Sequence, residues 1–440
     1  MFVRFLFILF CLFFFYLAEK KIIWAIAFIC AFLPSYLIRG RLLLFSIPLT
    51  LLEIMILILF FVWLHQTIRD RLSFRKIPLV WLISIIVWLV VATIALFVSP
   101  DLRAAAGRWK AYFIEPILFL VVLFNVVKTK QDRRLIFIAL GLSAFYLSLG
   151  AIYQYITGQG MISLEAWPNQ LVRRATSFFS DPNFLGLYLG PVVILIVGQL
   201  IEQFNKKQKK QFWLIVYYSV IIILSLLAII FARSEGALAG VIIGLILLGL
   251  YWRVSRRWVI IALIICSIFI IVLTPVRSFL WQKVTLRDFS GQIRLRIWRE
   301  TAIMLSERPL FGAGLAGYPI VMQQYHQPFY SQQLPLVLDI QPFPHNLLLS
   351  VWSELGILGL LIFIIIIIRI FQTGISTLKK TKNNKLGIIS LLVAMITILI
   401  HGLVDTPYFK NDLSVLFWII IGLGMVISCT KKQGEVAESG

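Results

Sequence analysis

The sequence predicts an all-α polytopic membrane protein with about twelve or thirteen transmembrane helices. Hydrophobic residues make up 60% of the 440 residues. They occur in long uninterrupted runs such as Val80–Val98, Phe212–Phe231, and Leu358–Ile368 with its flanks. Runs of this length match the hydrocarbon core of a bilayer. Backbone polar groups in lipid need partners within their own segment, so we expect each span to be a helix.

The predicted spans, in chain order, cover residues 2–17, 22–38, 42–64, 77–98, 111–127, 135–153, 184–201, 212–231, 236–252, 258–275, 346–371, 386–404 and 412–429. The first two are short, and they form either a helical hairpin or one broken element. The first apolar run resembles a signal peptide. No small-residue cleavage site follows it before the next span, so we expect it to be retained.

The formal net charge of +22 comes mostly from lysines and arginines in short loops between predicted spans. This distribution indicates orientation in a membrane, with membrane lipids and their anionic headgroups as partners, and it argues against nucleic-acid binding. The clusters fall on alternating connections, which we assign to the cytoplasm together with the C-terminus. They are Arg69, Arg71, Arg75, Lys76; Lys128, Lys130, Arg133, Arg134; Lys206, Lys207, Lys209, Lys210; Arg253, Arg256, Arg257; Lys379, Lys380, Lys382, Lys385; and Lys431, Lys432. Arg39 and Arg41 oppose this trend and leave the side of the N-terminus open.

The same alternation places the connections 99–110, 154–183, 232–235 and 276–345 outside. We expect the loops 154–183 and 276–345 to form an external cap that belongs to a single transmembrane domain covering residues 1–440. The second loop carries seven basic residues, which are Arg277, Lys283, Arg287, Arg294, Arg296, Arg299 and Arg308. Long loops cross the membrane regardless of charge. Two explanations of these basic residues therefore stay open. Either a long loop simply tolerates them outside, or they bind an external anionic ligand.

Residues 291–305 have helical periodicity and are expected to form an amphipathic helix on the outer surface. Arg294, Arg296 and Arg299 flank its apolar stripe. One interpretation is a surface helix that binds headgroups and contains an Arg296–Glu300 pair. The other is a set of arginines that binds a diphosphate, because guanidinium groups hold phosphate oxygens in bidentate fashion and keep their charge.

His345 precedes an apolar helix within Pro-His-Asn. It is either a structural residue at the helix start, with Asn346 as the N-cap, or a general base near the membrane surface. His401 and Asp405 are expected to satisfy each other within the bundle. The segment GAGLAG (312–317) is expected to be a tight turn after Pro309 and not a dinucleotide site, because no strand precedes it.

Three further features are assigned structural roles. Asp181-Pro182-Asn183 is predicted to start a helix. Arg233 and Glu235 are predicted to form a salt bridge at a tight turn. The four cysteines lie in apolar runs without metal-ligand spacing, so we expect no metal site.

Four segments, in this order, resemble the O-antigen ligase and O-antigen polymerase superfamily: RRATSFFSDPN, ARSEGALAG, RLRIWRETAIMLSERPLFGAGLAGY and PHNLLLSVWSELGILGLL. The later HGLVDTPYFKND is also similar. The resemblance extends over roughly residues 45–428 and is most specific over 291–361. It implies a glycosyltransferase that needs neither metal nor cofactor. Such an enzyme moves a glycan from an undecaprenyl-diphosphate carrier to a hydroxyl acceptor on the outer face of the plasma membrane, with inversion.

The resemblance also implies roles for individual residues. Arg296 corresponds to the family's loop arginine that contacts the diphosphate, and His345 to the loop histidine that activates the acceptor hydroxyl. Arg174 matches the arginine before the Asp-Pro-Asn turn. The family's Ser-Arg-Gly turn is replaced by Ser-Glu-Gly at 234–236, with Arg233 before it. We expect Arg174, Arg233, Arg294, Arg296 and Arg299 to bind the diphosphate.

Several alternatives stay open from the sequence. A ligase and a polymerase are not separated, and a shape-type peptidoglycan polymerase would be another relative. A lipid-linked glycan flippase or transporter would place buried charges deep in many spans. A membrane scaffold without chemistry would not need His345.

Overall fold

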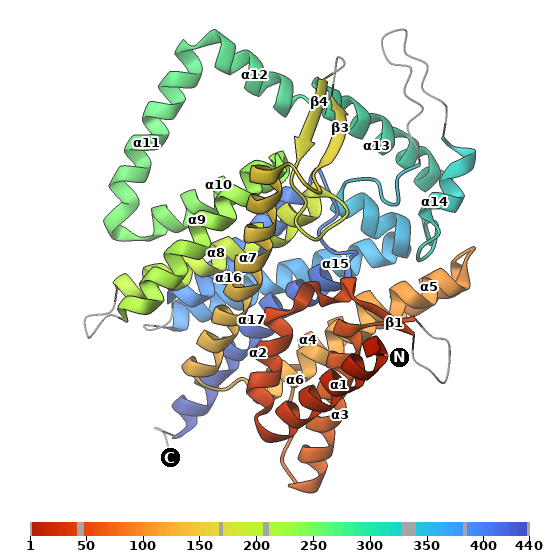
Figure 1. Cartoon of the computed structure of the whole chain (residues 1–440), viewed down its shortest axis with the longest axis vertical. Coiled ribbons are helices and arrows are strands. Elements are labelled where there is room, and N and C mark those ends of the chain that lie inside the picture. The colour runs from red at the N-terminus through yellow and green to blue at the C-terminus, as the bar shows by residue number, and fades with distance from the viewer. Residues whose placement is uncertain are drawn as a thin grey trace.

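Long apolar helices packed side by side form the body of the chain, as the computed structural model shows (Figure 1). The structure describes residues 2–41, 48–166, 170–205, 211–326, 340–381 and 385–437. Lys206, Lys207, Lys209, Lys210 and Lys382 lie outside the described residues, and so do the side chains of Lys431 and Lys432.

The first two helices form a hairpin, as one of the two sequence interpretations predicted. They are α1 (Phe2–Lys20) and α2 (Ile22–Ala31). The ring of Phe28 packs 6.0 Å from that of Phe10 and 5.8 Å from that of Phe14.

The predicted span 42–64 was wrong at its start. A short 3₁₀ helix, η1 (Leu33–Leu37), leads into strand β1 (Arg39–Arg41), which pairs antiparallel with β2 (Pro48–Thr50). Helix α3 (Leu51–Arg69) begins only after Thr50. Thr50 and Glu53 form a reciprocal capping box that satisfies the free backbone N–H groups of the first turn.

The middle of the chain alternates long helices with short connections. In order these are α4 (Leu79–Val98); α5 (Leu102–Trp109), continued by the π-helical turn η2 (Lys110–Ile114) and α6 (Glu115–Val126); α7 (Lys130–Thr157); α8 (Pro182–Phe204); α9 (Phe212–Ala232); and α10 (Glu235–Tyr251). The predicted loop 154–183 contains an antiparallel hairpin of β3 (Ile162–Ala166) and β4 (Gln170–Arg174). Figure 1 shows this hairpin above the bundle, near α13.

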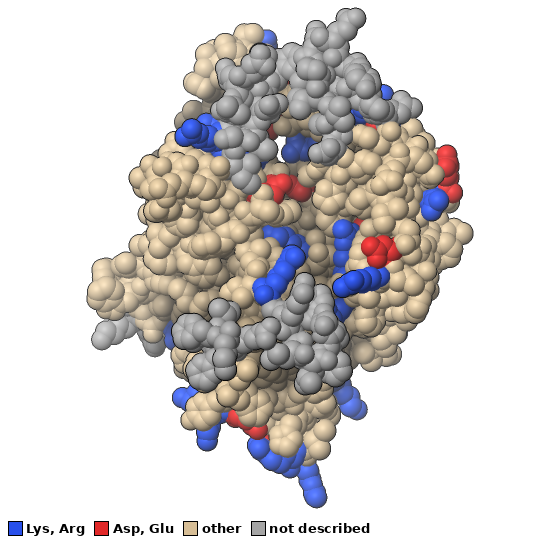
Figure 2. Space-filling model, turned by 45° about the vertical axis from the view of Figure 1, so that its right-hand side comes forward, with Lys and Arg blue, Asp and Glu red and all other residues tan. Residues whose placement is uncertain are grey.

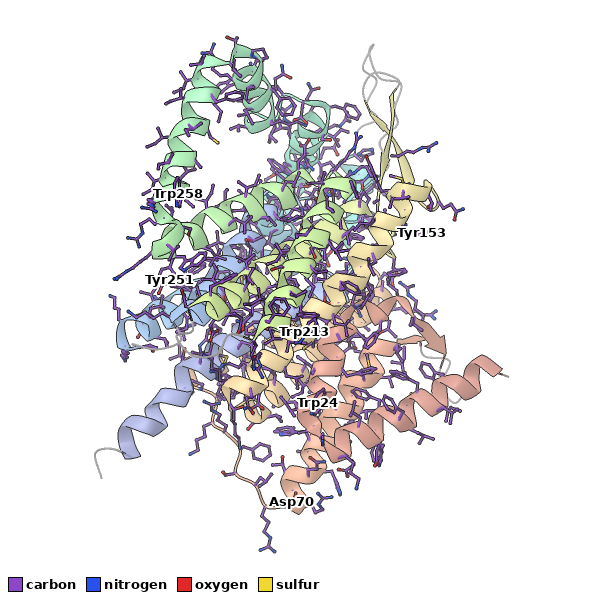
Figure 3. All side chains as sticks on the ribbon, turned by 60° about the vertical axis from the view of Figure 1, so that its left-hand side comes forward. Trp24, Asp70, Tyr153, Trp213, Tyr251 and Trp258 are labelled. Carbon is purple, nitrogen blue, oxygen red and sulfur yellow. The ribbon has the colours of Figure 1, made fainter. Side chains whose placement is uncertain are left out.

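Helix α11 (Arg253–Val272) stands apart from the bundle and leads into α12 (Thr274–Val284) (Figure 1). Neither helix has a buried residue. Trp258 lies near the start of α11 and Tyr251 at the end of α10, while Trp213 lies at the start of α9 (Figure 3). Exposed aromatic side chains at helix ends are typical of a membrane–water boundary.

The remaining helices include the arginine-rich helix and the helix that follows His345. They are α13 (Phe289–Glu307), α14 (Tyr318–Val321), η3 (Met322–Gln324), α15 (Leu347–Lys380), α16 (Lys385–His401) and α17 (Asn411–Ala437). Helix α13 contains the predicted helix 291–305. Of the long apolar helices that the structure describes, α8 and α17 are the most buried inside the bundle.

The predicted fold class is confirmed. Among the described residues, nine helices are long and apolar enough to cross a membrane. Three shorter apolar helices accompany them, which are Ile22–Ala31, Glu235–Tyr251 and Lys385–His401. The chain is therefore an all-α, multi-pass membrane protein.

Candidate functional site

Polar side chains gather at one end of the bundle, where several helices start or end. Asp181 caps the start of α8 and Asn346 caps the start of α15, each accepting a hydrogen bond from the first turn. Both predicted helix starts are confirmed. Three further segments reach the same end, as the contacts described next show. They are strand β4, the turn between α9 and α10, and the segment 402–410.

His345 pairs with Asp405 at this end. The distance from His345 Nδ1 to Asp405 Oδ1 is 3.4 Å. Asp405 is 4% exposed and also accepts a hydrogen bond of 2.8 Å from the Thr406 amide. Burial raises the pKa of Asp405, but the hydrogen bond and charge of His345, with a smaller effect from His401, outweigh burial and lower it. Asp405 is therefore an anion at neutral pH.

The backbone around this pair is fixed by contacts between the start of α15 and the segment after α16. Asn346 Nδ2 donates to the Leu403 carbonyl at 3.0 Å, and the Leu347 amide donates to the Gly402 carbonyl at 2.7 Å. His345 itself has a left-handed backbone, with φ of 49°. Histidine adopts this conformation more readily than most residues. The turn aims the imidazole across to Asp405, so His345 is a helix-start residue that also has a charged partner.

Helix α13 packs directly on this site through two residues one turn apart. Trp298 Nε1 donates to the Pro344 carbonyl at 2.9 Å, and Arg294 Nε donates to the Val404 carbonyl at 3.1 Å. Each acceptor directly precedes one member of the His345–Asp405 pair. Arg294 is therefore the arginine of α13 whose contacts place it beside the pair.

Arg174 and Asp181 belong to the same charged group. Arg174 Nε donates to the Ala232 carbonyl at 2.7 Å, and its Nη2 donates to Asn183 Oδ1 at 2.7 Å. Burial lowers the pKa of Arg174, and the positive charge of Arg294 adds to this effect. Burial raises the pKa of Asp181, and the charge of Asp405 raises it further. Arg174 thus fastens β4 to the end of α9 and adds positive charge to the site.

The predicted salt bridge between Arg233 and Glu235 was wrong. Glu235 pairs with Lys283 of α12 at 2.5 Å, and Lys283 also contacts Asp288 at 2.8 Å. Arg233 ends α9 with φ of 50° and is exposed. The turn requires Gly236, because a Cβ there would lie 2.4 Å from the His401 ring.

The predicted mutual pairing of His401 and Asp405 needs the same correction. The partners of Asp405 are the His345 imidazole and the Thr406 amide, and the described contacts include no ion pair between Asp405 and His401. Because 60 residues separate His345 from Asp405 in the sequence, local spacing favoured the wrong histidine.

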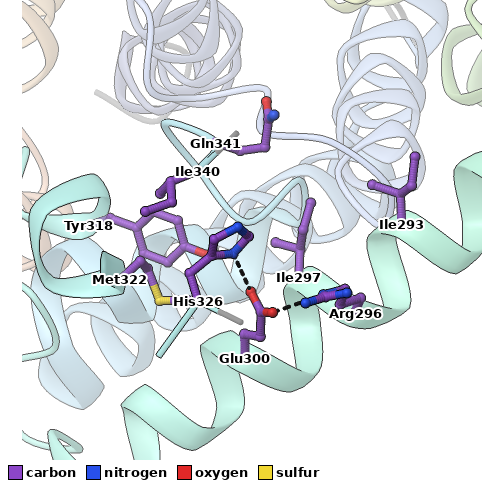
Figure 4. Close-up of a pocket in the computed structure, with 9 residues that line it drawn as sticks. All are labelled: Ile293, Arg296, Ile297, Glu300, Tyr318, Met322, His326, Ile340 and Gln341. Atoms are coloured by element: carbon purple, nitrogen blue, oxygen red, sulfur yellow. Dashed lines mark hydrogen bonds and ion pairs between the residues drawn. The ribbon is translucent and has the colours of Figure 1, made fainter. Parts of the chain in front are cut away.

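Arg296 lies in a second small cluster on another face of α13 (Figure 4). Its Nε contacts Glu300 Oε1 at 2.9 Å, and Glu300 Oε2 contacts His326 Nδ1 at 3.1 Å. The predicted Arg296–Glu300 pair is thus present. The cavity here has a volume of about 20 Å³, which is enough for a water molecule but not for a diphosphate. Residues two apart on a helix do not share a face, so Arg296 and Arg294 point into different surroundings.

Figure 2 shows Lys and Arg side chains gathered around a hollow on one face of the molecule, with acidic side chains among them. Arg299 is exposed on α13. A basic, hollowed face of this kind suits an anionic ligand.

The segment 312–317 forms the tight turn that the sequence predicted. Gly314 has φ of 76°, and a Cβ on it would lie 2.7 Å from the Ser99 amide nitrogen. The fully buried Glu354 holds the turn by accepting hydrogen bonds from the Ala316 amide at 2.8 Å and from Arg108 Nη1 at 2.6 Å. The turn is a packing element that anchors the C-terminal end of α13 to α15.

Sequence reasoning missed Lys410, which lies beneath the site. Its Nζ lies 3.8 Å from the Phe179 ring centroid, 4.1 Å from that of Phe184 and 3.9 Å from Asp412 Oδ1. Burial lowers its pKa, against the charges of Asp412, Asp181 and Asp405. The sequence did offer a signal for Lys410. It follows two aromatic residues and shortly precedes an acid, at the edge of an apolar stretch.

The described residues contain no group of three or more His, Cys, Asp or Glu side chains that could hold a metal ion. The positive charge of the site comes from arginine and lysine side chains.

One comparison with known proteins bears on this site. The O-antigen ligase family model matches residues 220–364. This segment includes Arg233, all of α13 and His345, whereas Arg174 and Asp405 lie outside it. No curated protein matches the chain. The match confirms the resemblance to the O-antigen ligase and O-antigen polymerase superfamily.

Proposed function

From its similarity to the O-antigen ligase family over residues 220–364, we propose that this multi-pass membrane protein is a glycosyltransferase. It moves a glycan from an undecaprenyl-diphosphate carrier to a hydroxyl acceptor, either as a ligase or as a polymerase. The reaction takes place on the outer face of the plasma membrane, with the C-terminus in the cytoplasm. The observation that carries the proposal is the pairing of His345 with buried Asp405 beside Arg294 and Arg174.

His345 acts as the general base. Its Nδ1 faces Asp405, so the donated proton lies on Nδ1 and the lone pair of Nε2 is left to accept a proton. An acceptor hydroxyl is a weak nucleophile until its proton is removed. Asp405 stabilises the imidazolium that forms when Nε2 takes this proton. The oxygen then attacks the anomeric carbon and the bond to the diphosphate breaks, with inversion.

Guanidinium groups stabilise the diphosphate as it leaves. Arg294 donates a hydrogen bond to the Val404 carbonyl next to Asp405. Arg174 lies close enough to Arg294 for their positive charges to interact. Fixed cations in a partly buried site stabilise developing negative charge without reorganising. We propose that these two arginines act first, and that Arg233 and Arg299, both exposed, contact the outer phosphate oxygens. Arg296 joins them only after leaving Glu300. Arginine supplies the charge throughout, so the proposed reaction needs no metal.

The lipid chain of the donor stays in the membrane during transfer. Helix α11 stands apart from the bundle with exposed apolar side chains, so these side chains can contact the lipid chain of the donor. A carrier that lies along α11 brings its diphosphate to α13 from the side.

The test is in-vitro transfer from an undecaprenyl-diphosphate-linked oligosaccharide, measured as release of undecaprenyl diphosphate. We expect His345→Ala and Arg294→Gln to lose most activity, whereas His65→Ala, which removes an exposed imidazole from α3, keeps it. Activity should persist with a chelator present. Normal turnover by His345→Ala would refute the base, and movement of an intact donor across vesicles without bond cleavage would favour a transporter.

A further inference from the structure

A second polar cavity lies at the opposite end of the bundle from His345. Its lining comes from α7, α8, α16, α17 and Gln211, and its volume is about 420 Å³. Lys130 and Arg133 line it at the first residues of α7, whose 28 residues carry the chain about 42 Å to the β3–β4 hairpin (Figure 1). The cavity is therefore separate from the proposed transferase site.

Positive charge dominates this cavity. Among the described residues, three cationic side chains line it, Lys130, Arg133 and Arg134, against the single acid Glu202. Lys130 is paired with Glu202, and Arg134 Nη1 donates to Gln211 at 2.7 Å. Gln211 is neutral, so the charges of Arg133 and Arg134 are left without an acid of their own among the described lining residues.

Arg133 is the more buried of these two arginines. It is 8% exposed, yet its guanidinium forms no hydrogen bond or ion pair within the described part of the chain. Gln199 of α8, itself 4% exposed, lines the same space. A guanidinium has five N–H donors, and Arg133 presents its own to the cavity that it lines. The arrangement fits a ligand with several acceptor oxygens and negative charge.

The surroundings indicate the class of ligand. Phe137 and Ile427 give the cavity an apolar side, and it opens at the ends of membrane-spanning helices, where lipid headgroups lie. Basic pockets between transmembrane helices suit phosphate headgroups, and the volume is within the range of sites that take small organic ligands. We propose that this cavity binds the phosphate of an anionic membrane phospholipid, held by Arg133.

The site would connect lipid composition to the stability of the bundle. Helices α7, α8, α16 and α17 all contribute to its lining, and two of them are the most enclosed of the long helices. A ligand that binds only the folded state raises the unfolding temperature. Anionic phospholipid should therefore stabilise the chain more than zwitterionic phospholipid does.

The test uses the full-length chain in detergent micelles titrated with phosphatidylglycerol, with phosphatidylcholine and with glycerol phosphate. Binding is read by native mass spectrometry and by the unfolding temperature. We expect Arg133→Gln to weaken phosphatidylglycerol binding by about tenfold or more, the effect of one charge-assisted hydrogen bond. Lys128→Gln removes an exposed charge from the same end without touching the cavity, and should leave binding unchanged.

A second variant with the opposite expected effect on binding keeps the test informative if Arg133→Gln misfolds. Glu202→Gln removes the one acid that the described part of the chain contributes to the lining, so it should strengthen phosphatidylglycerol binding. Equal binding by all three variants and the wild type would overturn the site. Equal stabilisation by glycerol phosphate would overturn the assignment to a lipid and indicate a soluble phosphate ester.

Discussion

Replacing Asp405 with asparagine should separate the electrostatic part of the proposed mechanism from its geometry. Asparagine has the same shape and can still accept from the Thr406 amide, which lies 2.8 Å away. It cannot supply the negative charge that His345 faces at 3.4 Å. The variant therefore keeps the fold but loses the group that stabilises the imidazolium.

The size of the effect follows from that distance. Two unit charges 3.4 Å apart interact by about 5 kcal/mol at an effective dielectric constant near 20. The His345 side chain is 26% exposed, and solvent screening reduces the net effect to about 2–3 kcal/mol, as for hydrogen bonds to charged groups. This corresponds to a fall in kcat of about 30- to 160-fold. The KM for the donor should change little, because Asp405 acts through His345 and not on the diphosphate.

The assay is the initial rate of undecaprenyl diphosphate release at several donor concentrations. Asp70→Asn is the matched control, since Asp70 is an exposed carboxylate at the end of α3 that pairs with Arg69. A kcat for folded Asp405→Asn within about threefold of the wild type would refute the role of this charge.

Three further outcomes concern stability, measured by thermal unfolding in detergent. Gly314→Ala should destabilise the chain by about 2–3 kcal/mol, because of its left-handed φ and the close backbone contact, whereas Gly107→Ala, with nothing within 4 Å of the added Cβ, should not. Arg108→Met should cost about 3–5 kcal/mol, because Glu354 stays buried without its partner, and the double variant with Glu354→Gln should recover part of the loss. On acidification from pH 6 to pH 3, the wild type should lose more stability than Asp405→Asn. The folded pKa of Asp405 is lowered, so its stabilising contribution is complete above the unfolded value near 4 and is lost as the pH falls through the folded value. Equal losses in both chains would contradict this.

Hydropathy predicted most of the long helices, because the length and apolar composition of a segment are what a membrane span requires. It failed at residues 48–50, which form a strand, because Pro48 and the Thr50–Glu53 capping box delay the helix to Leu51. Hydropathy also gave no sign that α11 stands alone, since a buried helix and a lipid-facing helix have similar compositions.

The sequence predicted the Arg296–Glu300 pair but not the pairing of His345 with Asp405. Periodicity placed Arg294 and Arg296 on one helix, and only packing shows which of them contacts the segment that holds Asp405. The pairing of His345 with Asp405 joins the start of α15 to the segment after α16, and no local spacing encodes such a contact. The missed Lys410 is similar, because its aromatic neighbours come from residues 179 and 184.

The isolation of α11 has a consequence for how that helix can vary. None of its residues is buried, and its packing is limited to its first turns, where Val259 lies close to Gly249 of α10. Beyond these turns the order of its isoleucines, leucines and valines is not set by packing within the described chain. Its 20 residues extend about 30 Å, the thickness of a bilayer core. Length and hydrophobicity are then the main requirements on this stretch. A variant with the same ends and the same apolar residues in another order should leave the position of α13 unchanged.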